Sequence, residues 1–171
     1  MTSIFKPLWQ ELAEQCRTDP TRAVAEMRAV CDSDTDDPLK WTVTGSPGSR
    51  DEMAIGQHPS LGGDGSVPCP GELVTMALAA CMDGTVRLFA DLMEIQVDRV
   101  RVEVVSRGDV RDLLGANDVN APADTGITMT VKVEAPGATE KQLADLRELS
   151  GAASGVLNML RRPLPVAVTW S

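Results

Sequence analysis

The sequence predicts an α+β fold in which antiparallel strands pack against one buried central helix. Residues 73–82 are apolar on every helical face except at Thr75, and residues 97–104 and 127–134 alternate between apolar and polar side chains. A helix that is apolar all round must be enclosed by other structure. A strand that alternates covers a core with one face and meets water with the other.

The N-terminal part of the chain is expected to be helical. Apolar residues recur at helical spacing from Ile4 to Leu12, and Asp19 followed by Pro20 is typical of the start of a second helix, which would run through Val30. These two helices predict an appendage, residues 1–37, to a main domain of residues 38–171.

The main domain is expected to begin with a hairpin and continue into the central helix. Residues 39–44 and 53–55 have strand character, and the sequence GSPG between them is typical of a turn. After the turn residues 62–65 and two prolines, Glu72 opens about twenty residues that contain no proline. The alternating strands follow this helix.

The C-terminal third is expected to hold two helices and a strand. A capped helix should begin at Thr139 and carry Leu143, Leu146 and Leu149 on one face, and a short helix should pass through Leu157. Residues 163–170 alternate and contain prolines, which predicts a strand at a sheet edge.

Composition and charge limit the classes of function. The net charge of -9 disfavours nucleic acid and anionic membranes as partners. Asp83 and Arg87 interrupt the central helix, so it is expected to be too short to span a membrane. The N-terminus is unlike a signal or transit peptide, which predicts a cytoplasmic protein with its cysteines as free thiols. The four cysteines form no CxxC pair and the chain has one histidine, so neither a metal nor another cofactor is expected.

One cysteine, Cys81, lies at the middle of the central helix. On residue type alone, it is a small buried core residue or a reactive thiol. The surrounding sequence HPSLGGDGSVPCPGELVTMALAACMDGT, the later RVRVEVV and the closing LNMLRRPLPVAV occur in the order found in the OsmC/Ohr family, which the chain resembles from residue 39 to residue 171.

The resemblance implies a wrapped, intertwined homodimer that reduces organic hydroperoxides. It places Cys81 at the position of the peroxidatic thiol and Arg50, after the predicted turn, at that of the arginine that holds the thiolate. A thiol at mid-helix gains little from the helix dipole, so a nearby cation is expected to lower its pKa. Arg50 is otherwise a solvated hairpin residue.

The same resemblance indicates three further candidate site residues. Glu72 matches the acidic residue at the helix opening, but it precedes Cys81 by nine residues, a rise of about 13.5 Å, so it could reach the thiol only across a dimer interface. Otherwise it is a favourable charge at a helix N-terminus. His58 and Cys69 are possible pocket residues, with an ordinary loop histidine and a packing cysteine as the alternatives.

The family's second, disulfide-forming cysteine is replaced here by Ser154. A serine forms no disulfide, and Cys69 is expected to be too distant along the chain to substitute for it. The sequence therefore predicts a peroxidase with a single reacting cysteine that an external thiol reduces. The alternative is a weakly active member that binds a hydrophobic ligand in its dimer pocket.

Overall fold

The computed structural model describes the chain except at residues 1, 32–35, 46–51, 117–124, 163 and 171. It divides into two compact units. The first comprises Met1–Glu14, Met76–Val104 and Met129–Ser171, and the second comprises Gln15–Thr75 and Val105–Thr128. The helix α2, Pro70–Leu92, contributes its first residues to the second unit and all the others to the first.

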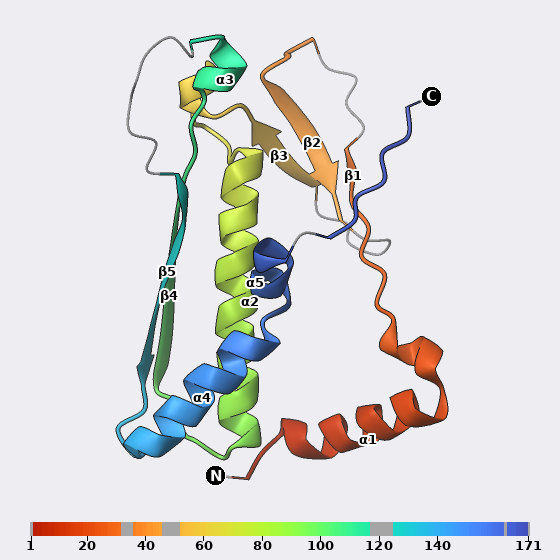
Figure 1. Ribbon diagram of the computed structural model, residues 1–171, viewed down its shortest axis with the longest axis vertical. Helices are drawn as coiled ribbons and strands as arrows, with labels where there is room; N and C mark the ends of the chain where they lie inside the picture. The colour runs from red at the N-terminus through yellow and green to blue at the C-terminus, as the bar shows by residue number, and fades with distance from the viewer. Residues whose placement is uncertain (1, 32–35, 46–51, 117–124, 163, 171) are drawn as a thin grey trace. The chain divides into compact units, whose positions relative to one another are not determined.

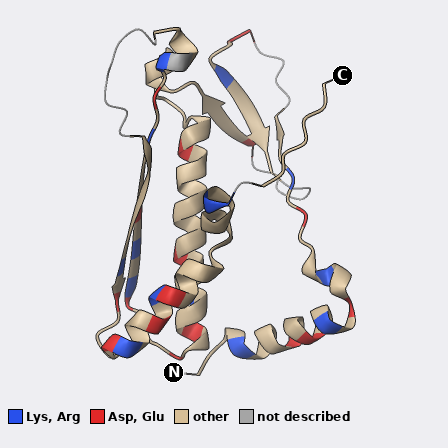
Figure 2. Cartoon of the chain, viewed as in Figure 1, with Lys and Arg blue, Asp and Glu red and all other residues tan. Residues whose placement is uncertain are grey.

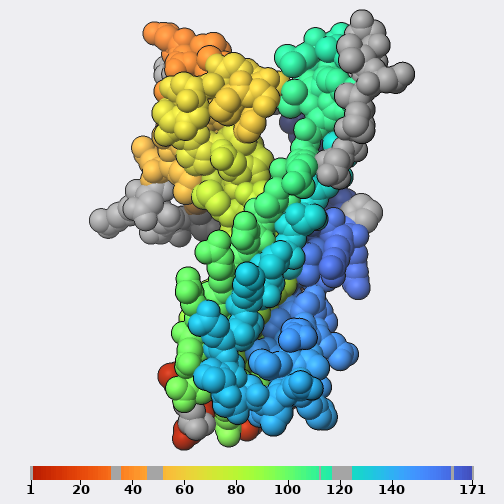
Figure 3. Space-filling model, turned by 90° about the vertical axis from the view of Figure 1, so that its left-hand side faces the viewer, coloured from red at the N-terminus to blue at the C-terminus, as the bar shows by residue number. Residues whose placement is uncertain are grey.

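The core of the first unit is built on one stripe of α2. Leu78, Met82, Val86 and Ala90 recur at every fourth position and are each at most 3% exposed. They pack against residues of the strands β4, Arg99–Arg107, and β5, Gly126–Glu134, and of the helices α4, Glu140–Ala153, and α5, Gly155–Arg161. In the space-filling view β4 and β5 lie side by side, with α4 next to β5 (Figure 3).

The strands and helices of this unit confirm their predicted types. At one end of the β4–β5 pair, Asp98 N–H donates to Glu134 O at 2.8 Å. Val100, Val102 and Val104 of β4 are buried or half-buried and alternate with exposed residues, as predicted. Thr139 and Gln142 form a reciprocal capping box at the start of α4, which confirms the predicted helix start.

The helix α2 is less covered than the sequence predicts. Met76, on the side opposite the buried stripe, is 47% exposed in the single chain, and Val74, one turn before Leu78, is 41% exposed. Charged residues are sparse along this helix (Figure 2). Its length of 23 residues and its mean hydropathy of 1.5 over an 18-residue window would allow it to cross a membrane, by length and composition only. The expectation that Asp83 and Arg87 make the helix too short was therefore wrong, because the helix continues through both. The core helix of a soluble protein can have the same length and hydropathy. The buried stripe of α2 is packed in the way expected of such a core helix.

The first helix, α1, Phe5–Thr18, is held at its N-terminus by a buried carboxylate of α2. Asp91 accepts a hydrogen bond from the Ser3 hydroxyl and from the N–H groups of Ile4, at 3.1 Å, and Phe5, at 2.8 Å. These bonds, that of Ser3 first, lower the pKa of Asp91. Anionic groups are favourable at a helix N-terminus because its first N–H groups lack partners inside the helix.

The second unit contains a three-stranded antiparallel sheet in the order β1-β2-β3 (Figure 1). The strands are β1, Val30–Cys31, β2, Lys40–Thr44, and β3, Glu52–Gly56. Trp41 of β2 lies opposite Ile55 of β3, which is 1% exposed. The pairing of β2 with β3 confirms the predicted hairpin. A short helix, α3, Arg111–Leu114, follows β4.

The second N-terminal helix was predicted wrongly. Asp19 does act as an N-cap, accepting from the N–H of Thr21, but the helix is a 3₁₀ turn, η1, Pro20–Ala23. The chain then continues without a helix into β1, where Val30 lies opposite Thr44 of β2. Pairing with a strand thus replaces the helix that the local sequence favours. The division of the chain at residue 37 stays a prediction.

The predicted C-terminal edge strand is absent from the described residues 164–170. Val166, Val168 and Trp170 are 82%, 68% and 93% exposed and pair with no strand that the structure describes. Pro165 has no N–H to donate to a sheet, so this segment depends on its other residues for pairing. The prediction of a strand here was wrong for the single chain.

Candidate functional site

The first unit brings Cys81 and Ser154 together, two residues that the sequence analysis singled out. The Cys81 Sγ atom lies 3.5 Å from the Ser154 Oγ atom. Cys81 is partly buried and Ser154 is fully buried. The thiol therefore faces a hydroxyl at the position where the resemblance implies a second cysteine.

A break between two helices places Ser154 beside the thiol. Ser154 ends α4 and precedes α5, and its backbone is extended, with φ -62° and ψ 110°. Its side chain makes no capping bond to α5. The first N–H groups of α5, those of Val156 and Gly155, instead lower the pKa of the Cys81 thiol. Free N–H groups at a helix start stabilise a nearby negative charge.

Opposing effects act on the pKa of the Cys81 thiol. Burial, the largest single effect, raises it, whereas hydrogen bonds from Ser154, the Val156 N–H, Thr85 and the Gly155 N–H lower it. Together the hydrogen bonds outweigh burial, and the pKa lies below its ordinary value. No cation of the described residues is among these causes. The described residues lower this pKa through hydrogen-bond donors, and a contribution from Arg50 stays a prediction.

Glu72 and Cys69 lie at the start of α2, in the second unit. Cys69 precedes the first helical residue, and its N–H donates to the Glu72 Oε2 atom at 2.8 Å. This bond, the largest cause, lowers the pKa of Glu72. Glu72 thus makes the backbone contact of a capping glutamate. This contact agrees with the second interpretation of Glu72, a favourable charge at a helix N-terminus. Cys69 is buried and has a free thiol.

His58 has a local role in the same unit. Its Nδ1 atom accepts from the Ser60 N–H at 3.1 Å and caps the 3₁₀ turn η2, Pro59–Leu61. Two residues after this turn, a Cβ atom on Gly63 would lie 1.7 Å from the Gln57 carbonyl oxygen, so only glycine fits. These contacts account for His58 as a loop residue.

Arg50 lies outside the described residues, so its part in the site stays a prediction.

Like Cys69, Cys16 and Cys31 are free thiols, partly buried and exposed respectively. The Cys31 thiol donates to the Thr42 carbonyl oxygen at 3.2 Å.

Sequence analysis missed Thr85 and the two amides of the α4–α5 break as neighbours of the thiol. Thr85 lies one turn after Cys81, and its hydroxyl donates to the Cys81 carbonyl oxygen at 2.6 Å, so it must rotate away from this oxygen to donate to the thiolate. Its spacing of four residues along the helix was a usable signal. The pair Ser154-Gly155 inside a helical pattern also indicated a break, but not where the freed amides would lie.

The chain matches known proteins in sequence pattern and in fold. The family model described as OsmC-like protein matches residues 63–169. A search of curated proteins found no match.

Solved structures of low sequence identity share the fold. An OsmC-like protein from Mycoplasma pneumoniae is 16% identical, with a TM-score of 0.57 over 81% of this chain and 87% of that one. An organic hydroperoxide resistance protein from Elizabethkingia anophelis is 17% identical, with a TM-score of 0.59 over 82% and 91%. The organic hydroperoxide resistance protein OhrB of Bacillus subtilis is 14% identical, with a TM-score of 0.53 over 81% and 93%. These likenesses confirm the predicted α+β fold, with a central helix and small antiparallel sheets.

Proposed function

Because the chain belongs to the family of OsmC-like proteins, we propose that it reduces organic hydroperoxides with Cys81 as the reacting thiol. The observation that carries the proposal is the set of hydrogen-bond donors around the Cys81 sulfur, which lowers its pKa despite burial. The thiolate is the nucleophilic form of cysteine, so a lowered pKa raises the fraction that can attack a peroxide at neutral pH. Two of the proteins with a similar fold are organic hydroperoxide resistance proteins, which agrees with this substrate class.

The proposed reaction has two stages. The Cys81 thiolate attacks one oxygen of the peroxide, the O–O bond breaks, and the alkoxide takes a proton and leaves as an alcohol. Cys81 is then a sulfenic acid. One external thiol displaces water from it to give a mixed disulfide, and a second external thiol releases the Cys81 thiol as the external disulfide forms. An external reductant is needed because Ser154 forms no disulfide with Cys81.

Mass spectrometry after one equivalent of cumene hydroperoxide tests this function. In the presence of dimedone, the adduct of a sulfenic acid is expected on the peptide that contains Cys81. The other three cysteines of the same sample serve as controls. An adduct on Cys16 or Cys31, with none on Cys81, would reject Cys81 as the reacting thiol.

The alternative function, binding of a hydrophobic ligand without peroxide chemistry, is favoured by the serine at position 154. The same experiment separates the two. A Cys81 that stays a thiol while cumene hydroperoxide persists supports the binding function.

We also propose that the protein is an obligate homodimer in the cytoplasm, which binds neither nucleic acid nor membrane. The exposed apolar residues of α2 and of the C-terminal segment support the dimer, because such surfaces in one chain call for cover. Sedimentation velocity at micromolar concentration is expected to give one species of about twice the chain mass of 18.2 kDa. A folded monomer under these conditions would contradict the dimer.

A further inference from the structure

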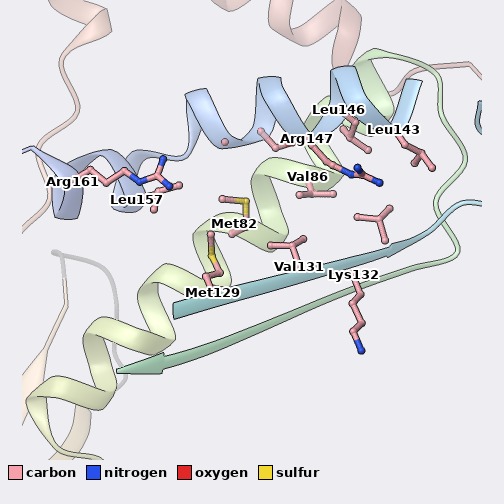
Figure 4. Close-up of a pocket in the computed structure, with 13 residues that line it drawn as sticks. Met82, Val86, Met129, Val131, Lys132, Leu143, Leu146, Arg147, Leu157 and Arg161 are labelled. Carbon is pink, nitrogen blue, oxygen red and sulfur yellow. The ribbon is translucent and has the colours of Figure 1, made fainter. Parts of the chain in front are cut away.

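The inward face of α4 changes from apolar to polar toward the end that lies beside Cys81. Leu143 and Leu146 belong to the apolar core and line a cavity next to α2 (Figure 4). The buried positions that follow are both serines, Ser150 at 1% exposure and Ser154 at 0%. Two buried hydroxyl groups, one helical turn apart, therefore lead from this core toward the thiol.

The first of these hydroxyl groups is unsatisfied. The Ser150 Oγ atom has no hydrogen-bond partner among the described residues. A buried polar group without a partner is unfavourable, and such groups in native proteins call for an explanation. The Ser154 N–H donates to the Ser150 carbonyl oxygen at 3.1 Å, which is the spacing of one helical turn. Side chains so placed are neighbours, with Cβ atoms about 5–6 Å apart, a separation that a hydrogen bond between two serine hydroxyl groups can span.

Ionisation of Cys81 fixes the direction of its hydrogen bond with Ser154. Across the 3.5 Å between them, either the thiol or the hydroxyl can be the donor. A thiolate has no proton, so the Ser154 hydroxyl must then donate, and its oxygen keeps its lone pairs as acceptors. This oxygen is fully buried, so bulk water does not supply a donor. The Ser150 hydroxyl, one turn away and without a partner among the described residues, can supply one.

We propose that Ser150 is a positioning residue that acts on Cys81 through Ser154: when the thiolate forms, the Ser150 hydroxyl turns and donates to the Ser154 oxygen. This inference rests on the proposed function, in which Cys81 reacts as a thiolate. Hydrogen bonds in a chain polarise one another, so the bond from Ser150 makes Ser154 a stronger donor to the sulfur. A Ser150 hydroxyl that bonds instead to the carbonyl one turn before it, as helical serines can, would not act on Cys81.

The rate at which iodoacetamide alkylates Cys81 in the full chain tests the proposal. On the acidic side of its midpoint, this rate is proportional to the thiolate fraction. Ser150→Ala should lower it about threefold, because polarisation strengthens a hydrogen bond to a charged group by about 10–30%. The rate at the alkaline plateau should not change. In a Ser154→Ala background, Ser150→Ala should have no effect, since the residue through which it acts is gone. Ser3→Ala, a buried serine of the same unit whose hydroxyl donates to Asp91, is the matched control and should leave the rate unchanged.

The Ser150→Ala protein should be as stable to heat as the wild type, because the hydroxyl that it loses has no partner among the described residues. An unchanged alkylation rate in Ser150→Ala would overturn the proposal. So would a decrease of equal size with and without the Ser154 hydroxyl, or a decrease that persists at the alkaline plateau. Alkylation needs no peroxide, so the two proposals fail separately. Peroxide consumption with unchanged alkylation in Ser150→Ala rejects only the role of Ser150, whereas the predicted alkylation pattern without peroxide consumption rejects only the peroxidase.

Discussion

Replacing Cys81 by serine is expected to reduce the consumption of cumene hydroperoxide to the rate without protein. The substitution removes the only atom that the proposed reaction uses as a nucleophile, and a serine hydroxyl at this site has no comparable acidity. The measurement is the loss of peroxide with time in the presence of an excess of a small thiol. The Cys81→Ser protein should remain folded, because the two side chains differ by one atom.

Cys69→Ser is the matched control for this experiment. Cys69 is buried at the start of α2, where serine is a favoured capping residue, so the variant should fold and its first turnover should be unchanged. Equal loss of activity in both variants, or full activity in Cys81→Ser, would contradict the assignment of Cys81.

Replacing Ser154 by cysteine is expected to change the fate of the oxidised protein. In the wild type, a Cys81 sulfenic acid has no partner thiol at position 154, so excess peroxide should convert it to sulfinic acid, which ordinary thiols do not reduce. Activity should therefore fall within a few turnovers at high peroxide. In Ser154→Cys, an internal disulfide should form first and reduce the sulfinic fraction several-fold.

The geometry of the site favours this crosslink. The Cys81 Sγ and Ser154 Oγ atoms are 3.5 Å apart, and a disulfide needs about 2.05 Å between its sulfur atoms, so the two groups must approach by about 1.5 Å. Peptide mapping without reduction would detect the bond. Ser154→Ala should form no crosslink and should still be overoxidised. A Ser154→Cys protein without the crosslink after mild peroxide would show that the two positions do not approach in solution.

Much of the fold was predictable because its signals are local. Residues around Pro70 fix the start of α2, Thr139 fixes the start of α4, and alternation identifies β4 and β5. The failures concern pairing at a distance. β1 replaces a predicted helix because Val30 pairs with Thr44, and the C-terminal residues 164–170 pair with no strand among the described residues.

The candidate site was predictable in part for the same reason. The position of Ser154 beside Cys81 followed from the resemblance, and the 3.5 Å contact agrees with it. The source of the lowered pKa did not follow, because the relevant donors come from the backbone at a helix break, which side-chain identity does not report. The sequence analysis therefore predicted a cation near Cys81 and did not identify the amides of Gly155 and Val156.

The most direct test of the account is the pH dependence with which iodoacetamide alkylates Cys81, followed on its peptide by mass spectrometry. Only the thiolate reacts, so the midpoint of the rate reports the pKa of the thiol. For the wild type, the midpoint should lie below that of N-acetylcysteine, and Ser154→Ala should raise it because one hydrogen bond to the thiolate is lost. A wild-type midpoint at or above that of N-acetylcysteine would contradict the claim that hydrogen bonds at the α4–α5 break activate Cys81.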